Sequence, residues 1–159
     1  MLKPDLLRKH ISQAVPWLRD NPDNLAVYVQ KGRMVSTGQR SASFEYEYTI
    51  EVLAMDYPEP LDTLSLPILA WARLYQPELL FNPDRARDGI TFEADILSNS
   101  TMDVLIKIQA SEAVVVKVEE GKPVIHHRAD PMPGPELGAW SLVFEDMVSG
   151  ETWTDVNER

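Results

Sequence analysis

The segment from Ser43 to Met55 alternates between apolar and polar residues with a period of two. One set of positions is aromatic or aliphatic and comprises Phe44, Tyr46, Tyr48, Ile50 and Val52, and the set between them comprises Glu45, Glu47, Thr49, Glu51 and Leu53. A period of two places one set on each face of a β-strand, which no helix could do with these residues. The chain is therefore expected to be built on a sheet, with an acidic face on this strand.

The N-terminal segment predicts a helix. Pro4 stands at a first-turn position and is followed at helical spacing by Leu7, Ile11, Ala14, Val15 and Leu18. Pro16 falls late in this pattern, so we expect a kink or an irregular last turn there. Asn21-Pro22-Asp23 ends the segment.

A second helix is predicted after the Tyr57–Pro60 break, with Asp62 or Ser65 as its cap and Pro67 tolerated only in its first turn. It should end by Gln76, because Pro77 follows. Its apolar residues leave almost no polar face: Leu64, Leu66, Ile68, Leu69, Trp71, Ala72, Leu74 and Tyr75. Such a helix must be covered on more than one side, by the sheet and by another surface such as a neighbouring subunit.

The remaining patterns predict further strands. We expect a short strand over Leu25–Gln30 with a turn at Lys31-Gly32, then an extended connection over residues 34–42, and a polar loop over Pro83–Asp88. Ile90–Ile96 and Val104–Ile108 alternate and should form an antiparallel hairpin around Asn99. Another β-rich run is predicted over Ala113–Glu119, with Lys122–Arg128 pairing to it across Glu120-Gly121.

These elements predict an α+β fold with a single mixed, mostly antiparallel sheet flanked by two main helices. We expect an α/β domain over residues 1–128. Residues 129–159 are expected to form a proline-rich linker, stiffened at residues 130–135, and a C-terminal β arm or hairpin over Trp140–Trp153 with a turn at Ser149-Gly150.

Composition narrows the classes of function. The 159 residues carry 25 acidic and 15 basic side chains, a net charge of −10, so the overall field repels phosphate backbones and anionic lipid. Sequence-specific nucleic-acid binding is therefore not expected, and no apolar run approaches the roughly 20 residues of a membrane helix. The absence of cysteine excludes disulfides and thiolate chemistry and suits a cytosolic protein.

The sequence offers little catalytic chemistry. His10 fits a partly exposed helix residue, and His126 and His127 with Asp130 form the one cluster that resembles metal ligands. Adjacent strand residues point to opposite faces, so the two imidazoles are badly placed for one ion. The phosphate-loop, metalloprotease and nucleophile-elbow motifs are absent. We therefore predict neither an enzyme nor a cofactor.

The acidic row of Glu45, Glu47 and Glu51 leaves three interpretations open. It could hold a cation or act as paired carboxylates, it could be the hydrated face of a strand, or it could meet a basic partner. Hydration is the favoured interpretation of the three. Tyr46 and Tyr48 are predicted to be core residues whose hydroxyls reach the edge of the sheet.

Several short motifs, in order, resemble a known family. They are Met1-Leu2-Lys3-Pro4-Asp5, Asn21-Pro22-Asp23, Ser43-Phe44-Glu45 with Tyr48-Thr49, Pro67 with Leu69-Ala70-Trp71, Gln76-Pro77, and Phe92 with Ala94-Asp95-Ile96. Over roughly Met1 to Val118 the chain resembles the R tail completion proteins of P-two-like contractile-tailed phages. The C-terminal arm and Pro16 depart from that pattern.

The resemblance implies a structural virion protein, a tail terminator with a small α/β fold that assembles as a ring, usually of six. It would cap the head-proximal end of a phage or tailocin tail, contact tube, sheath and head-neck connector proteins, and let DNA pass without binding it. It would lie in the virion tail and, during assembly, in the host cytoplasm. The candidate interface residues are Glu45, Glu47, Glu51, Trp71, Leu74, Tyr75, Trp140 and Trp153.

Three alternatives remain open at this point. The chain could be a neck adaptor that joins tail to head, or an assembly chaperone that leaves the finished particle. More remotely, it could be an enzyme that depends on its carboxylates. The first two would share the fold but differ in whether the protein stays in the tail.

Overall fold

The computed structural model describes residues 1–38, 40–98 and 100–128. Its centre is a five-stranded sheet in which the order is β1 (Leu25–Ser36), β2 (Phe44–Tyr57), β4 (Met102–Glu119) and β3 (Ile90–Ile96), with β5 (Lys122–His127) paired to the far end of β4. Every strand pair among the described residues is antiparallel. The predicted α+β class with a single sheet is confirmed.

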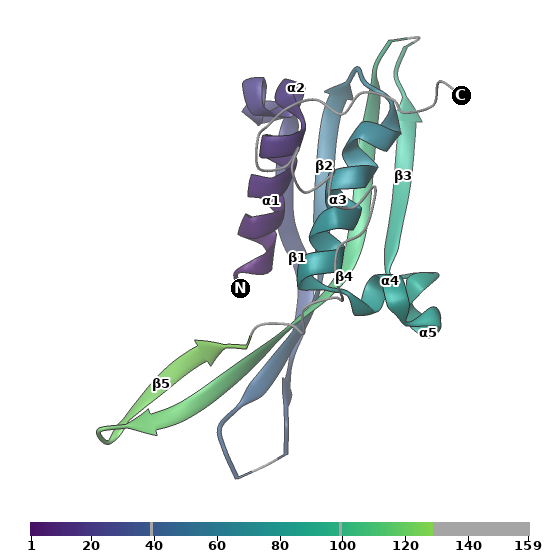
Figure 1. Cartoon of the computed structure of the whole chain (residues 1–159). Helices are drawn as coiled ribbons and strands as arrows, with labels where there is room; N and C mark the ends of the chain where they lie inside the picture. Colours follow the sequence, from purple (N-terminus) through teal and green to yellow (C-terminus); the bar gives the residue numbers. More distant parts are fainter. Residues whose placement is uncertain (39, 99, 129–159) are drawn as a thin grey trace.

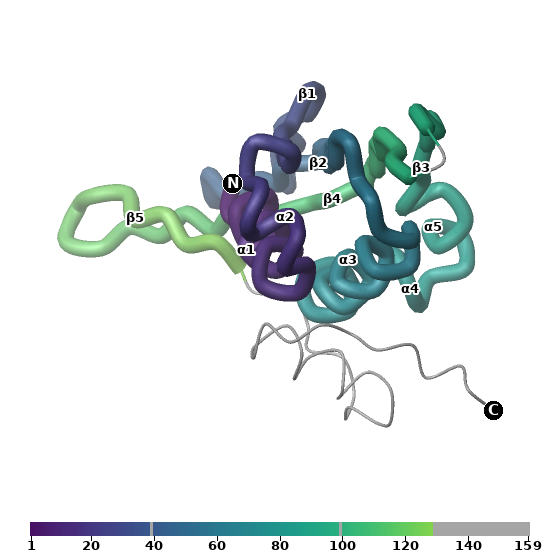
Figure 2. The backbone as a smooth tube through the Cα atoms, turned by 90° about the horizontal axis from the view of Figure 1, so that it is seen from above, coloured from purple at the N-terminus to yellow at the C-terminus, as the bar shows by residue number. Residues whose placement is uncertain are grey.

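The described helices lie on one face of this sheet (Figures 1 and 2). α1 (Lys3–Ala14) and α3 (Leu61–Tyr75) run along it, and α3 leads into two short helices beside β3. The smaller helical elements are α2 (Pro16–Asp20), the 3₁₀ turn η1 (Pro22–Asn24), α4 (Glu78–Phe81) and α5 (Pro83–Ala86). The opposite face of the sheet is not covered by any helix of the described part of the chain.

β2 follows the predicted alternation. The side chains of Tyr48, Ile50, Val52 and Ala54 are at most 5% exposed and form the centre of the core. They pair across the sheet with alternate residues of β4, so that Ile50 lies opposite Ile108 and Val52 opposite Ile106. Both strands therefore supply one apolar face to α1 and α3, and Leu7, Ile11, Leu64, Ile68 and Trp71 cover it.

β1 corrects one prediction. The chain does not turn at Lys31-Gly32 but continues as one strand to Ser36, with a register shift between Val29 and Gly32. Gly32 is needed there because a Cβ at this position would lie 2.9 Å from the Cβ of Tyr48. Glycine in this strand marks a close approach to β2, and not a turn.

The helix at the N-terminus ends as Pro16 requires. α1 stops at Ala14, Val15 adopts extended backbone angles, and α2 begins at Pro16. The interruption at this proline confirms the expected irregularity. The two helices then bury Leu7, Ile11 and Leu18 fully against the sheet.

α3 ends at Tyr75, as predicted, but differs at its start. Its N-cap is Pro60, with no side-chain hydrogen bond from Asp62 or Ser65, whose hydroxyl instead donates 3.0 Å to the carbonyl of Leu61. Pro67 lies inside the helix and is buried, beyond the first turn in which it was expected. As a proline it donates no helical hydrogen bond at this position.

The later strands also refine the predictions. β3 and β4 form the predicted antiparallel hairpin, but β4 is one strand of 18 residues that includes the separate run expected over Ala113–Glu119. β5 pairs with it across Glu120-Gly121, as predicted.

Pro83–Ala86 is a short helix and not a loop, because the side chain of Asn82 caps it at the backbone N–H of Asp84, 3.0 Å away. The predicted linker and C-terminal arm lie outside the described residues, and the division at residue 128 stays a prediction.

Candidate functional site

The acidic row of β2 lies on the face of the sheet that the helices leave uncovered. Basic side chains of the two neighbouring strands lie beside its carboxylates. Glu47 accepts a hydrogen bond of 2.6 Å from Nε of Arg33 on β1. Glu51 is only 8% exposed, because Tyr28 of β1 and Lys107 of β4 flank it on the two neighbouring strands. The row is thus a hydrated face only in part, since its inner member is buried by cross-strand neighbours.

Electrostatic effects extend across this face. The hydrogen bond to Glu51 raises the pKa of Tyr28, and the hydrogen bond to Glu93 raises the pKa of Lys107. Nζ of Lys107 lies 3.1 Å from Oε1 of Glu93. A row of polar side chains therefore crosses β1, β2, β4 and β3 and consists of Tyr28, Glu51, Lys107 and Glu93. The carboxylates of the row do not converge on one point, as paired catalytic carboxylates must.

The histidines also find separate partners. His127 places Nδ1 3.0 Å from Oε2 of Glu112, while Nε2 of His126 lies 3.6 Å from Oε1 of Glu119. His10 contacts the carbonyl of Leu6 at 2.7 Å and the ring edge of Tyr75, and burial lowers its pKa. Among the described residues, which do not include Asp130, no three acidic or histidine side chains are grouped to hold a metal ion.

A buried polar cluster, which sequence reasoning missed, joins the start of α1 to β4. The carboxylate of Glu112, a residue 5% exposed, accepts hydrogen bonds from the backbone N–H groups of Leu2 and Lys3 at 2.9 and 3.0 Å and from the hydroxyl of Tyr48. A carboxylate at this position satisfies first-turn donors and interacts favourably with the helix dipole. Glu112 thus caps α1 from another element, because Leu2 supplies no side-chain cap.

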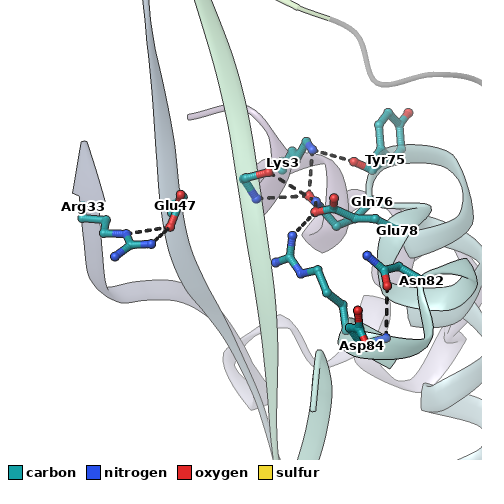
Figure 3. Close-up of polar contacts among 10 residues, drawn as sticks. Lys3, Arg33, Glu47, Tyr75, Gln76, Glu78, Asn82 and Asp84 are labelled. Carbon is teal, nitrogen blue, oxygen red and sulfur yellow. Dashed lines mark hydrogen bonds and ion pairs between the residues drawn. The ribbon is translucent and has the colours of Figure 1, made fainter. Parts of the chain in front are cut away.

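The same cluster continues to the end of α3 (Figure 3). Nζ of Lys3 donates to the carbonyl of Tyr75 at 2.5 Å and to Oε1 of Gln76 at 2.8 Å. Gln76, 1% exposed, also accepts from the backbone N–H of Ser111 and donates 2.6 Å to Glu78. A cation at the C-terminal end of a helix is favourable for the same reason that an anion is at the other end. The cluster therefore fixes α1, α3 and β4 relative to one another.

One signal in the sequence pointed to this cluster. Glu112 belongs to the set of alternate residues of β4 that faces the core, which also contains Val104, Ile106, Ile108, Ala110 and Val114. The strand pattern therefore places a carboxylate on the core-facing side. Such a carboxylate needs partners to remain buried. The partners themselves come from distant parts of the chain.

The candidate interface residues divide by burial. Trp71 is fully buried in the monomer core, whereas Leu74 and Tyr75 are partly exposed on α3. Glu45 and Glu47 are partly exposed on the uncovered face of the sheet. Trp140 and Trp153 lie outside the described residues. α3 is covered by the sheet and by α1 within one monomer, which accounts for most of its apolar surface.

Comparison with known proteins identifies the family of this chain. Residues 1–131 match the family model described as P2 phage tail completion protein R (GpR). Tail completion protein R of Escherichia phage P2 is 37% identical over 133 residues, which cover 84% of this chain and 86% of that protein. The chain belongs to the P2 phage tail completion protein R family. No solved structure matches it.

Membership of this family supports a structural role in phage tail completion and a location in the virion tail. It confirms the family that the short motifs indicated. The match extends past Val118, the limit of the resemblance seen in the sequence, and includes all of β5. Within the described ranges, no helix has the length and hydrophobicity to cross a membrane.

Proposed function

We propose that this protein caps the head-proximal end of a phage or tailocin tail, where it stops growth of the tube and sheath and prepares the tail for joining to the head. Family membership supports tail completion as the general role. The observation that carries the finer step is that the exposed apolar side chains of the monomer include two separate regions, one at Val118 and Ile125 and one at Phe92.

Two separate apolar regions favour a ring. A subunit in a closed ring contacts its two neighbours through different surfaces, and both surfaces lose water on assembly. A ring, as a hexamer, would present the same face of every subunit to the tube. It would therefore provide one terminating layer on which no further tube subunit can add.

The charge of the protein is consistent with a passage for DNA. The net charge of −10 and the uncovered acidic face of β2 repel a phosphate backbone. If this face borders the opening of the ring, the genome passes without binding. The uncovered face would then act through its field, with Arg33 and Lys107 already paired to glutamates.

The proposal is tested by infection with a phage that lacks this gene, followed by electron microscopy of the lysate. We expect tails of abnormal length that are not joined to heads, and restoration by the wild-type gene supplied from a plasmid. Tails of normal length joined to heads in the absence of the protein would contradict the proposal.

Wild-type lysates test the two related roles. Mass spectrometry of purified wild-type tails should find the protein at a fixed ratio to the tube subunit. Its absence from mature tails would instead identify an assembly chaperone. Its presence on finished necks but not on isolated tails would identify an adaptor.

A further inference from the structure

The β4–β5 hairpin, residues 114–127, projects from the body and carries an exposed apolar face (Figure 1). Val116 lies opposite Ile125, and Val118 lies opposite Pro123, so the four side chains share one face. Val118 is 76% exposed and Ile125 is 63% exposed. The face is in phase with Val114, which is buried, and thus continues the core face of the sheet beyond the helices.

A second apolar surface is a groove between α3 and β3. Its volume is about 220 Å³, and Ile68 and Leu69 of α3, Leu79 and Leu80 of α4, and Ile90 and Phe92 of β3 line it. Phe92 is 61% exposed at its border. We call this feature the α3–β3 groove. An apolar hollow beside an exposed aromatic ring is typical of a site that receives apolar side chains.

The two surfaces lie on opposite sides of the monomer. In both views the hairpin extends to one side, while β3, α4 and α5 form the other side (Figures 1 and 2). A two-fold dimer could join the hairpin of each copy to the groove of the other only if both surfaces lay on the same side of the monomer, whereas surfaces on opposite sides give a head-to-tail contact. The hairpin of one copy therefore points outward, as contact with the groove of a neighbouring copy requires.

The charges of the two strands are complementary. From Lys122 to Arg128 the ionisable side chains are basic or histidine, and from Ile90 to Ile96 they are the acidic Glu93 and Asp95. β3 and β5 are both edge strands, since each pairs only with β4 among the described strands. Lys122 and Arg128 lie on the hairpin face opposite Val118 and Ile125, and Glu93 and Asp95 lie on the face of β3 opposite Phe92. These opposite charges would favour the approach of a hairpin to β3 of another copy and select against contact of one hairpin with another.

We propose that the apolar face of the β4–β5 hairpin of one copy packs into the α3–β3 groove of the next copy. Val118 and Ile125 enter beside Phe92. This inference rests on the ring in the proposed function and assigns the surfaces that make it. The free β3 edge is covered in the same contact, which protects it from unspecific pairing.

The natural absence of cysteine permits a direct test by disulfide crosslinking. Val118→Cys and Phe92→Cys are made separately and together, both at exposed positions that preserve the core. On mild oxidation, a mixture of the two single variants should give a mixed covalent dimer, and the double variant should give a ladder that ends at one ring size. Met34→Cys, at a side chain 74% exposed on β1, is the matched control and should not link to Phe92→Cys.

The crosslinking is done both with purified protein at high concentration and with tails isolated from infected cells. Loss of the mixed dimer in both preparations, links between two copies of Val118→Cys, or links from Met34→Cys to Phe92→Cys would each overturn the assignment. Circular dichroism checks that every variant is folded. Ile125→Glu should reduce the mixed dimer at least tenfold.

The proposed function is judged separately, from tails that contain the cysteine variants and from cells infected by a phage that lacks the gene. Tails of correct length that contain the protein but lack the Val118–Phe92 link would leave the terminator role standing and remove the hairpin-groove contact. Normal tails in the complete absence of the protein would remove the terminator role itself.

Discussion

The backbone N–H of Lys3 donates a hydrogen bond of 3.0 Å to Oε1 of Glu112, so the first turn of α1 is attached to β4 across most of the chain length. The Nδ1 atom of His127 approaches the other carboxylate oxygen at 3.0 Å. One carboxylate thereby connects the N-terminus, the sheet and the β4–β5 hairpin. The contact with His127 adds a side-chain link between the base of the hairpin and the rest of the sheet.

Glu112→Ala should lower the free energy of unfolding by about 3 kcal/mol, because it removes hydrogen bonds to a charged group and leaves the Tyr48 hydroxyl and the α1 N–H groups without their acceptor. Urea denaturation measures the change. Glu119→Ala, in the exposed part of the same strand, is the control and should change stability by less than about 0.5 kcal/mol. A loss at Glu112 as small as that of the control would contradict the capping role.

Stability should depend on pH through Glu112. Burial alone would raise the pKa of Glu112, but hydrogen bonds from Tyr48 and from the backbone of Lys3 and Leu2 outweigh burial and hold the pKa below its usual value. The unfolded state then binds the proton more readily. The contribution of Glu112 is therefore complete above the unfolded pKa of about 4.3 and is lost as pH falls through the lower folded pKa.

The measurement is the urea midpoint of the wild type and of Glu112→Gln, followed from neutral pH down to about pH 3. The wild type should lose more stability than the variant over the acidic part of this range. Parallel curves for the two proteins would show that another group causes the acid sensitivity.

Trp71→Ala should cost about 3 to 5 kcal/mol, because Trp71 is fully buried in the monomer core. Trp71→Phe should cost less than half as much, since it keeps most of the apolar volume and removes an indole N–H that has no hydrogen-bond partner in the described part of the chain. Urea unfolding of both variants tests this order. A folded Trp71→Ala monomer of normal stability that fails to assemble would instead place Trp71 at a subunit contact.

Gly32→Ala should destabilise the protein by about 1 to 3 kcal/mol, because the new Cβ would lie 2.9 Å from the Cβ of Tyr48 and 3.2 Å from the carbonyl oxygen of Glu47. Thermal unfolding followed by circular dichroism measures the effect. Gln30→Ala, at an exposed position of the same strand, is the comparison and should be nearly neutral. Equal melting temperatures for the two variants would show that β1 and β2 separate without cost.

The strands were predictable where one face is apolar and the other polar. β2 and the β3–β4 hairpin follow that period, and the antiparallel pairing of β3 with β4 is as expected. The predictions at Gly32 and Pro67 were wrong, because local preference favours a turn at glycine and a helix start at proline. In the structure, close packing of β1 on β2 determines the backbone at Gly32, and burial of α3 determines the position of Pro67. Tertiary contacts outweighed the local signal at both positions.

The candidate site was predictable only in part. The period of β2 correctly placed Glu45, Glu47 and Glu51 on one face, but the cations beside them come from β1 and β4, whose register is not encoded near these residues. Likewise, the α3–β3 groove exists only once α3 and α4 pack beside β3. Surfaces formed by distant segments leave no local pattern in the chain.

β4 runs without interruption from Met102 to Glu119, about 60 Å at 3.3 Å per residue, so the strand that builds the body also builds the hairpin. A protruding segment that is already ordered loses little conformational entropy when it meets a neighbour, unlike a flexible tail that must fold on contact. The hairpin is preorganised for association. Each added subunit would therefore retain a larger share of the free energy of its apolar contacts, and incomplete assemblies would be more readily completed.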